Sequence, residues 1–203
     1  KIPAMTRSGG RTADQPRTIS IEPGFVRTAD GSALISIGET RVICTASVDT
    51  NVPKWMVGRG GGWVTAEYGM LPASTGQRKR RDKGGRQDGR SVEIQRLIGR
   101  SLRCAIDLDK LGERSVYVDC DVLQADGGTR CAAITGGYVA LHLALQKLVA
   151  GGDLKQLPLI TSVAAISAGI VEGDALLDLE YIEDSRADVD ANVVMTGDDG
   201  LVE

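Results

Sequence analysis

Residues 115–149 read SVYVDCDVLQADGGTRCAAITGGYVALHLALQKLV, and this stretch decides the fold. Apolar and polar residues alternate from Ser115 to Gln124, which is typical of a half-buried strand. The apolar segment 131–149 predicts a helix, which Gly151 and Gly152 end. Between them lies the string Asp126-Gly127-Gly128-Thr129-Arg130. The stretch therefore predicts a strand, a tight glycine bend and a helix.

Working outward, apolar residues at steps of three and four predict a second helix after residue 90, with Ser91 as its N-cap and Gly112 as its stop. Further strands are expected at residues 33–37, 41–48, 63–68, 161–171, 175–181 and 192–196. This order of elements predicts an α+β fold with mixed β-sheets and packed helices.

The composition of the 203-residue chain fits a single domain over residues 1–203, because a 42% hydrophobic content is enough for one core. Residues 1–6 are expected to be a tag or disordered. No stretch approaches 18 apolar residues, so no membrane partner is expected. The four cysteines form no C-x-x-C pair and His142 stands alone, which excludes a zinc site and predicts buried free thiols in a reducing, cytoplasmic protein.

The charge is unevenly distributed along the chain. Residues 77–103 hold ten Lys and Arg against three Asp and Glu, whereas residues 170–203 hold eleven Asp and Glu against one Arg. A basic segment suits a polyanion, and an acidic one suits a metal ion or simple solvation.

The glycine bend is a candidate anion site. Free N–H groups and the positive end of the helix dipole meet there, Gly127 and Gly128 allow close backbone approach, Thr129 can cap and donate, and Arg130 can fork onto two oxygens. A plain glycine turn with a surface arginine fits the same spacing. Arg90 precedes the second helix and would clamp the same anion if that helix start faced the bend; the alternative is a solvated arginine.

The acidic run at residues 183–190 contains Asp184 and Asp190. Carboxylates of this kind suit Mg²⁺ or Mn²⁺ beside phosphate oxygens, and a solvated acidic loop is the alternative. The run follows an apolar strand directly, which predicts carboxylates at a strand end.

The basic run Arg78-Lys79-Arg80-Arg81, with Lys83 and Arg86, favours sequence-independent polyanion binding, and a solubilising loop is its alternative. No nucleophile–base set for acyl chemistry is present. What remains is a reaction in which bound phosphate attacks and carboxylates assist with a metal.

Long strings of the chain resemble the ribonuclease PH family of phosphate-dependent 3′-to-5′ exoribonucleases. The resemblance runs from about residue 7 to the end and rests on GWVTAEYGMLP (62–72), EIQRLIGRSLR (93–103), DCDVLQADGGTR (119–130), DLEYIED (178–184) and NVVMT (192–196). It implies a fold like the second domain of ribosomal protein S5. It also implies an enzyme that trims tRNA precursors with inorganic phosphate as co-substrate, and that transfers nucleotides in reverse.

The resemblance implies a role for each candidate residue. Arg90, Gly128, Thr129 and Arg130 would bind inorganic phosphate. Asp184 and Asp190 would bind Mg²⁺ or Mn²⁺ or assist proton transfer. Residues 78–81 would contact tRNA, and the subunits would form a homo-hexamer, a trimer of dimers.

The chain departs from the family at Arg7-Ser8-Gly9-Gly10-Arg11, where relatives commonly have Arg-Pro-Asp-Gly-Arg, and at Ala73, where many have arginine. It stops three residues into an expected strand, so the family's C-terminal strand and helices are expected beyond it. Two other functions remain open: a catalytically silent RNA-binding subunit of an exosome-like ring, and an enzyme that acts on a small phosphate compound.

Overall fold

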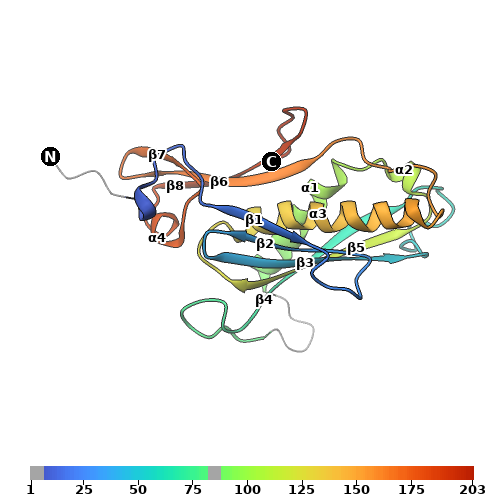
Figure 1. Cartoon of the computed structure of the whole chain (residues 1–203), viewed down its shortest axis with the longest axis horizontal. Helices are drawn as coiled ribbons and strands as arrows, with labels where there is room; N and C mark the ends of the chain where they lie inside the picture. Colours follow the sequence, from blue (N-terminus) through green and yellow to red (C-terminus); the bar gives the residue numbers. More distant parts are fainter. Residues whose placement is uncertain (1–6, 82–87) are drawn as a thin grey trace.

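The computed structural model describes residues 7–81 and 88–203 (Figure 1). Residues 1–6, expected to be a tag or disordered, lie outside the described residues, as do Lys83 and Arg86 of the basic run. The elements in chain order are a 3₁₀ turn (Ser8–Gly10), β1 (Ile19–Pro23), β2 (Gly31–Ile37), β3 (Thr40–Asp49), β4 (Trp63–Met70), α1 (Gly89–Arg103), α2 (Leu108–Leu111), β5 (Ser115–Gln124), α3 (Thr129–Ala150), β6 (Val163–Val171), β7 (Asp174–Leu177), α4 (Tyr181–Asp184) and β8 (Val189–Thr196).

The larger sheet has five strands in the order β1-β2-β3-β5-β4. Neighbouring strands are antiparallel except β4 and β5, which run parallel and are connected through α1 and α2. Parallel strands require such a crossover. Because β4 and β5 point the same way, their C-terminal ends lie together, and the glycine bend follows directly from the end of β5.

The smaller sheet has three antiparallel strands in the order β7-β6-β8. The predicted hairpin turn between β6 and β7 is present, with positive φ at Glu172 (52°) and Gly173 (89°). The confirmed α+β prediction therefore includes one mixed sheet and one antiparallel sheet.

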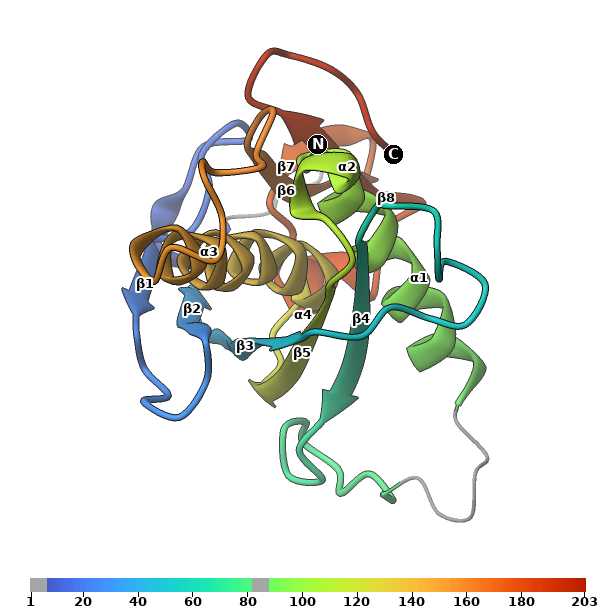
Figure 2. The ribbon, with the colours of Figure 1, turned by 90° about the vertical axis from the view of Figure 1, so that its right-hand side faces the viewer.

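Helix α3 lies between the two sheets (Figures 1 and 2). It packs against β2, β3 and β5 on one side and against β6 on the other, while α1 packs against β4. The helix approaches the larger sheet closely at Gly136, where an added Cβ would lie 2.7 Å from Ile35 Cγ2 and 2.8 Å from Cys44 Sγ. Within the described ranges, α3 is also the one helix long and apolar enough to cross a membrane, a test that a buried core helix also passes.

Several expected boundaries are wrong. The strand expected at 175–181 ends at Leu177, because Asp178 has a φ of 55° and residues 181–184 form α4, whose capping box joins Glu180 and Glu183. The N-cap of α1 is Asp88, whose side chain accepts a hydrogen bond from the Arg90 amide, and not Ser91. Helix α1 ends at Arg103, and Gly112 ends the separate helix α2. The expectation of buried thiols is also wrong for Cys104, which is exposed.

Candidate active site

A cleft of about 640 Å³ lies where the C-terminal ends of β4 and β5 meet the start of α3, helix α4 and strand β8. It gathers segments that are far apart in the sequence. Its lining residues are Met70, Thr75, Gly76, Gln77, Lys79, Arg90, Ala125, Gly127, Gly128, Thr129, Arg130, Ser167, Tyr181, Asp184, Asp190, Ala191 and Asn192.

The glycine bend has a conformation that only glycine adopts easily. Gly127 and Gly128 have φ values of 75° and 67°. A Cβ on Gly127 would lie 2.5 Å from the Leu179 carbonyl oxygen, so no larger residue fits. The buried hydroxyl of Thr40 fixes the bend from below, since it accepts from the Asp126 amide (2.9 Å) and donates to the Gly127 carbonyl (2.6 Å).

The start of α3 leaves its amides free. Gly128 occupies the N-cap position and has no side chain to cap the helix, whose first internal bond runs from the Ala132 amide to the Gly128 carbonyl. Among the described residues, the amides of residues 129–131 have no acceptor. Thr129 was expected to cap but lies one position inside the helix, where its Oγ1 accepts from the Tyr68 hydroxyl at 3.0 Å. The positive end of a 22-residue helix therefore opens into the cleft uncapped.

Two arginines border this helix start. The exposed Arg90, in the first turn of α1, lines the same cleft as Arg130, so the starts of α1 and α3 border one cleft. Arg130 Nη2 pairs with Glu93 Oε2 at 2.7 Å, whereas its Nε has no hydrogen-bond partner in the described part of the chain. Each guanidinium keeps donors for a ligand in the cleft.

The two aspartates also line the cleft, from different elements: Asp184 ends α4 and Asp190 lies in β8. The expected position at the end of a strand is therefore wrong for Asp184. Burial and the neighbouring Asp190 raise the pKa of Asp184, while Arg90 and Arg130 act in the opposite direction. In the described ranges neither carboxylate has an ion-pair partner.

A divalent cation fits this pair in one respect: two neighbouring carboxylates without a cationic partner are the donor set that Mg²⁺ or Mn²⁺ prefers. The described residues contain no group of three or more His, Cys, Asp and Glu placed to hold a metal. Water, phosphate oxygens and the neutral oxygens of the cleft would supply the remaining ligands.

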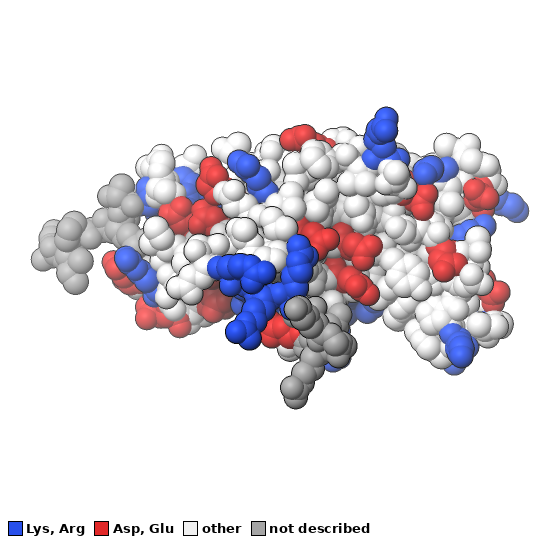
Figure 3. Space-filling model, turned by 90° about the horizontal axis from the view of Figure 1, so that it is seen from below, with Lys and Arg blue, Asp and Glu red and all other residues white. Residues whose placement is uncertain are grey.

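The basic run at residues 78–81 is exposed and borders the cleft. Lys79 lines the cleft itself, and with Arg80, Arg81 and Arg90 it also lines an adjoining hollow of about 270 Å³. Arg78 lines neither. A compact group of Lys and Arg side chains, next to a group of Asp and Glu, is visible on this face in Figure 3.

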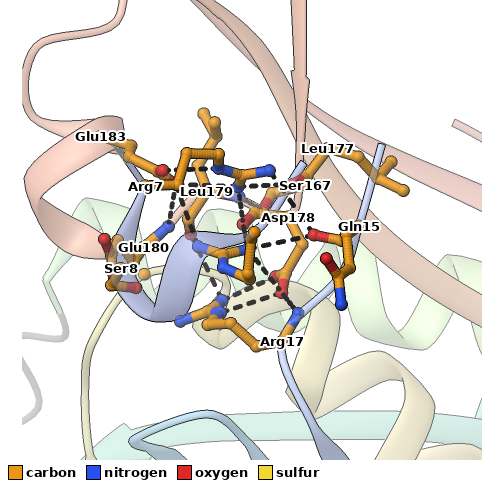
Figure 4. A network of polar contacts seen from close by, with 12 residues as sticks. Arg7, Ser8, Gln15, Arg17, Ser167, Leu177, Asp178, Leu179, Glu180 and Glu183 are labelled. Carbon is orange, nitrogen blue, oxygen red and sulfur yellow. Dashed lines mark hydrogen bonds and ion pairs between the residues drawn. The ribbon is translucent and has the colours of Figure 1, made fainter. Parts of the chain in front are cut away.

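A buried network behind the cleft was not predicted (Figure 4). Arg7 pairs with Glu183 through Nε–Oε1 (2.7 Å) and Nη2–Oε2 (3.0 Å), and Arg17 forks onto Asp178 through Nε–Oδ2 (2.9 Å) and Nη2–Oδ1 (2.7 Å). Arg11 lies within 3.8 Å of both acidic side chains. The arginines of this network come from the N-terminal segment and its carboxylates from residues 178–183. The sequence indicated that the N-terminal segment is polar but did not indicate these ion pairs.

This network reaches both sides of the cleft. Glu183 precedes Asp184 in α4, and Arg17 Nη1 donates to the carbonyl of Asp126 in the glycine bend. The N-terminal segment therefore fixes the bend and α4 relative to each other.

Sequence reasoning also missed Tyr68, which lines the adjoining hollow, and three residues that line the cleft, Ser167, Tyr181 and Asn192. Asn192 could have been predicted, because it lies two residues after Asp190 on one strand and therefore shares the same face of the sheet. Its Oδ1 accepts from Cys131 Sγ at 3.3 Å. Burial raises the pKa of the Cys131 thiol to about 12, which makes it a poor nucleophile.

Comparison with known proteins identifies the family of the chain. Models of the 3′ exoribonuclease family match residues 15–145 (domain 1) and residues 161–203 (domain 2). The chain is 58% identical to ribonuclease PH of Roseobacter denitrificans over 198 residues, covering 97% of this chain and 84% of that protein. It is also 58% identical to ribonuclease PH of Neisseria gonorrhoeae over 194 residues, covering 95% and 80%.

Solved structures show the same fold. An Archaeoglobus fulgidus exosome with RNA bound to its active site aligns with a TM-score of 0.78 at 26% identity, covering 97% of this chain and 80% of that one. An archaeal exosome core gives 0.72 at 26% identity, covering 96% and 76%. Rice Rrp46 gives 0.76 at 22% identity, covering 97% and 83%, and supports the fold alone. Two family models over most of the sequence, relatives of high identity and a shared fold together show that the chain belongs to the ribonuclease PH family of 3′ exoribonucleases.

Proposed function

We propose that the chain is a phosphate-dependent 3′-to-5′ exoribonuclease that trims the 3′ ends of tRNA precursors. The observation that carries this proposal is one cleft in which an uncapped helix start and two arginines face two carboxylates. In the forward direction RNA is shortened and a nucleoside diphosphate is released. In the reverse direction, the same site transfers a nucleotide from the diphosphate to RNA.

Inorganic phosphate is the attacking group in this reaction. The free amides of residues 129–131, the Thr129 hydroxyl and the guanidinium groups of Arg90 and Arg130 supply donors to its oxygens. One phosphate oxygen forms a bond to the phosphorus of the last phosphodiester, and the bond from that phosphorus to the 3′ oxygen breaks. The terminal nucleotide leaves as a diphosphate and the new RNA end takes up a proton. Fixed donors around the transferring group stabilise the charge that develops there.

Asp184 and Asp190 would hold Mg²⁺ or Mn²⁺, and the ion would supply charge stabilisation on the transferring phosphoryl group and the leaving oxygen. Burial and the charge of Asp190 raise the pKa of Asp184, which favours the protonated form of its carboxyl group, the form that donates a proton to the leaving 3′ oxygen.

Product analysis tests the function directly. Incubating the chain with a tRNA precursor, Mg²⁺ and phosphate should release nucleoside diphosphates at a rate that rises with phosphate concentration. Nucleoside monophosphates, or release without phosphate, would refute phosphorolysis. A silent RNA-binding subunit would bind the precursor and release nothing; the presence of both arginines and both carboxylates in one cleft argues against that alternative.

The exposed basic run should contact the RNA backbone. Changing Arg78, Arg80 and Arg81 to glutamine should weaken RNA binding and flatten the plot of log affinity against log salt by about 0.7 for each RNA phosphate that the variant no longer neutralises. The KM for inorganic phosphate should stay unchanged. Binding titrations between low and moderate salt measure the slope.

A charge-matched control is a triple variant of the exposed residues Arg27, Arg59 and Lys155, none of which lines the cleft. Equal slopes in the two triple variants would show that the basic run does not contact RNA. We also propose a homo-hexamer, a trimer of dimers, which the likeness to exosome structures supports and a light-scattering mass would test.

A further inference from the structure

Tyr68 lies behind the proposed phosphate site and is almost completely buried. It occupies the C-terminal part of β4, opposite Cys120 of the parallel strand β5, and is 5% exposed. Its hydroxyl donates to Thr129 Oγ1 at 3.0 Å. This is its one side-chain hydrogen bond within the described ranges.

The direction of this bond decides what the Thr129 hydroxyl can do. A threonine hydroxyl has one hydrogen and two acceptor positions. A phenol is more acidic than an aliphatic hydroxyl and is the better donor, so Tyr68 supplies the hydrogen between the two oxygens. The Thr129 hydrogen is then free to turn elsewhere, and no described residue accepts it. Thr129 is 8% exposed and lines the cleft, so its hydrogen can point to an acceptor in the cleft, which is water or a bound ligand.

Tyr68 stays a donor over the working pH range. Burial raises the pKa of its phenol, and the bond to Thr129 and the charges of Arg90 and Arg130 only partly oppose this effect. The influence of both arginines also places the phenol beside the pair that would hold the phosphate.

We infer that Tyr68 is a positioning residue that orients the Thr129 hydroxyl so that its hydrogen points to the bound inorganic phosphate. The inference rests on the proposed function and adds to it, because Tyr68 lines the adjoining hollow and not the cleft proposed to hold the phosphate, and so acts on the phosphate through Thr129. The substrate whose binding it controls is therefore the small anion.

The test is Tyr68→Phe, which removes only the hydroxyl. The KM for phosphate should rise about three- to tenfold, as expected for the removal of one hydrogen bond, while the KM for RNA stays unchanged. Phosphate should also protect the variant from thermal unfolding only at correspondingly higher concentration, a readout that does not depend on turnover. Tyr117→Phe, at a phenol that is 41% exposed on β5 and outside the cleft, is the matched control and should change neither constant.

A double-mutant cycle separates positioning from general support. Thr129→Val removes the hydroxyl that Tyr68 orients, so adding Tyr68→Phe to it should change the KM for phosphate by less than about twofold. If Tyr68→Phe raises the KM for phosphate as much in the Thr129→Val background as in the unmodified chain, the inference is overturned. Equal rises of the KM for phosphate and the KM for RNA in Tyr68→Phe, or an unchanged KM for phosphate, would also overturn it. If Arg130→Ala abolishes phosphate dependence while Tyr68→Phe is silent, the inference alone fails. If neither variant alters the response to phosphate, the proposed function fails as well.

Discussion

Arg130→Ala is expected to lower the rate of phosphorolysis by about a hundredfold or more at fixed phosphate. Arg130 lines the cleft beside the uncapped start of α3, and its Nε has no partner among the described residues. Its positive charge and donors act on a group that gains negative charge during transfer, so their removal affects the transition state more than RNA binding. RNA affinity should therefore stay within about twofold of the unmodified chain, because the other basic side chains still neutralise the RNA backbone.

Rates at several phosphate concentrations and RNA titrations measure the two effects separately. The rate of phosphorolysis by Arg130→Lys should lie between the rates of the unmodified chain and of Arg130→Ala, since lysine keeps the charge and loses the planar guanidinium group. Arg96→Ala is the control: Arg96 is exposed on α1 and lies outside the cleft. Normal turnover by Arg130→Ala would mean that phosphate binds elsewhere.

The part of the site that the sequence predicts is the part made by local structure. The alternation that ends at Gln124, followed by two glycines and an apolar helix, predicted the bend and the start of α3 and made them a candidate anion site, with a plain glycine turn as the alternative. Such a site requires only consecutive residues, because backbone amides form it. The predicted capping role of Thr129 was wrong, because Gly128 occupies the N-cap position. The Thr129 hydroxyl accepts a hydrogen bond from Tyr68 instead.

Residues 178–184 show where local pattern failed. Leu177, Leu179 and Tyr181 alternate with acidic residues as in a strand, but the chain turns at Asp178 with a φ of 55°. The hydrogen bonds that Arg17 makes with Asp178 hold this turn from a distance of 161 residues along the chain. A tertiary contact of that separation leaves no periodic signal in the sequence.

The meeting of Arg90 with the bend and with both aspartates also needed tertiary information. Arg90 belongs to the crossover between β4 and β5, whereas Asp184 and Asp190 belong to the smaller sheet and its short helix. Spacing alone left these groups as separate surface features. The family resemblance grouped them as one site, and the structure places them around one cleft.

Glu183→Gln is expected to have the largest effect on stability. Glu183 is fully buried and accepts two hydrogen bonds from Arg7, which is itself 5% exposed. Glutamine leaves the buried guanidinium without its counter-charge, which typically costs about 3–5 kcal/mol. For a chain of this size, the midpoint of thermal unfolding should fall by roughly 10 °C. Glu22→Gln, an exposed change in β1, is the control and should leave the midpoint unchanged.

The ion pair between Arg7 and Glu183 also makes the free energy of unfolding depend on pH. Burial alone would raise the pKa of Glu183, but the hydrogen bonds and charge of Arg7 outweigh it and lower the pKa; Arg17 has the same net effect on Asp178. A carboxyl whose pKa is lower in the folded state contributes its full stability above its ordinary pKa and loses it as pH falls through the folded value. The free energy of unfolding should therefore decrease between about pH 5 and pH 3, and Glu183→Gln should flatten that decrease.

Unfolding by urea at pH 7, 5, 4 and 3 measures both effects in one set of experiments. A variant that lost stability at pH 7 but kept the full acid dependence would show that other carboxyls cause the dependence. Because Glu183 precedes Asp184 in α4, the substitution Glu183→Gln should also lower the rate of the reaction. At a temperature where the variant is fully folded, turnover should fall further for Glu183→Gln than for Glu22→Gln, since only the first change frees the helix that carries Asp184 into the cleft.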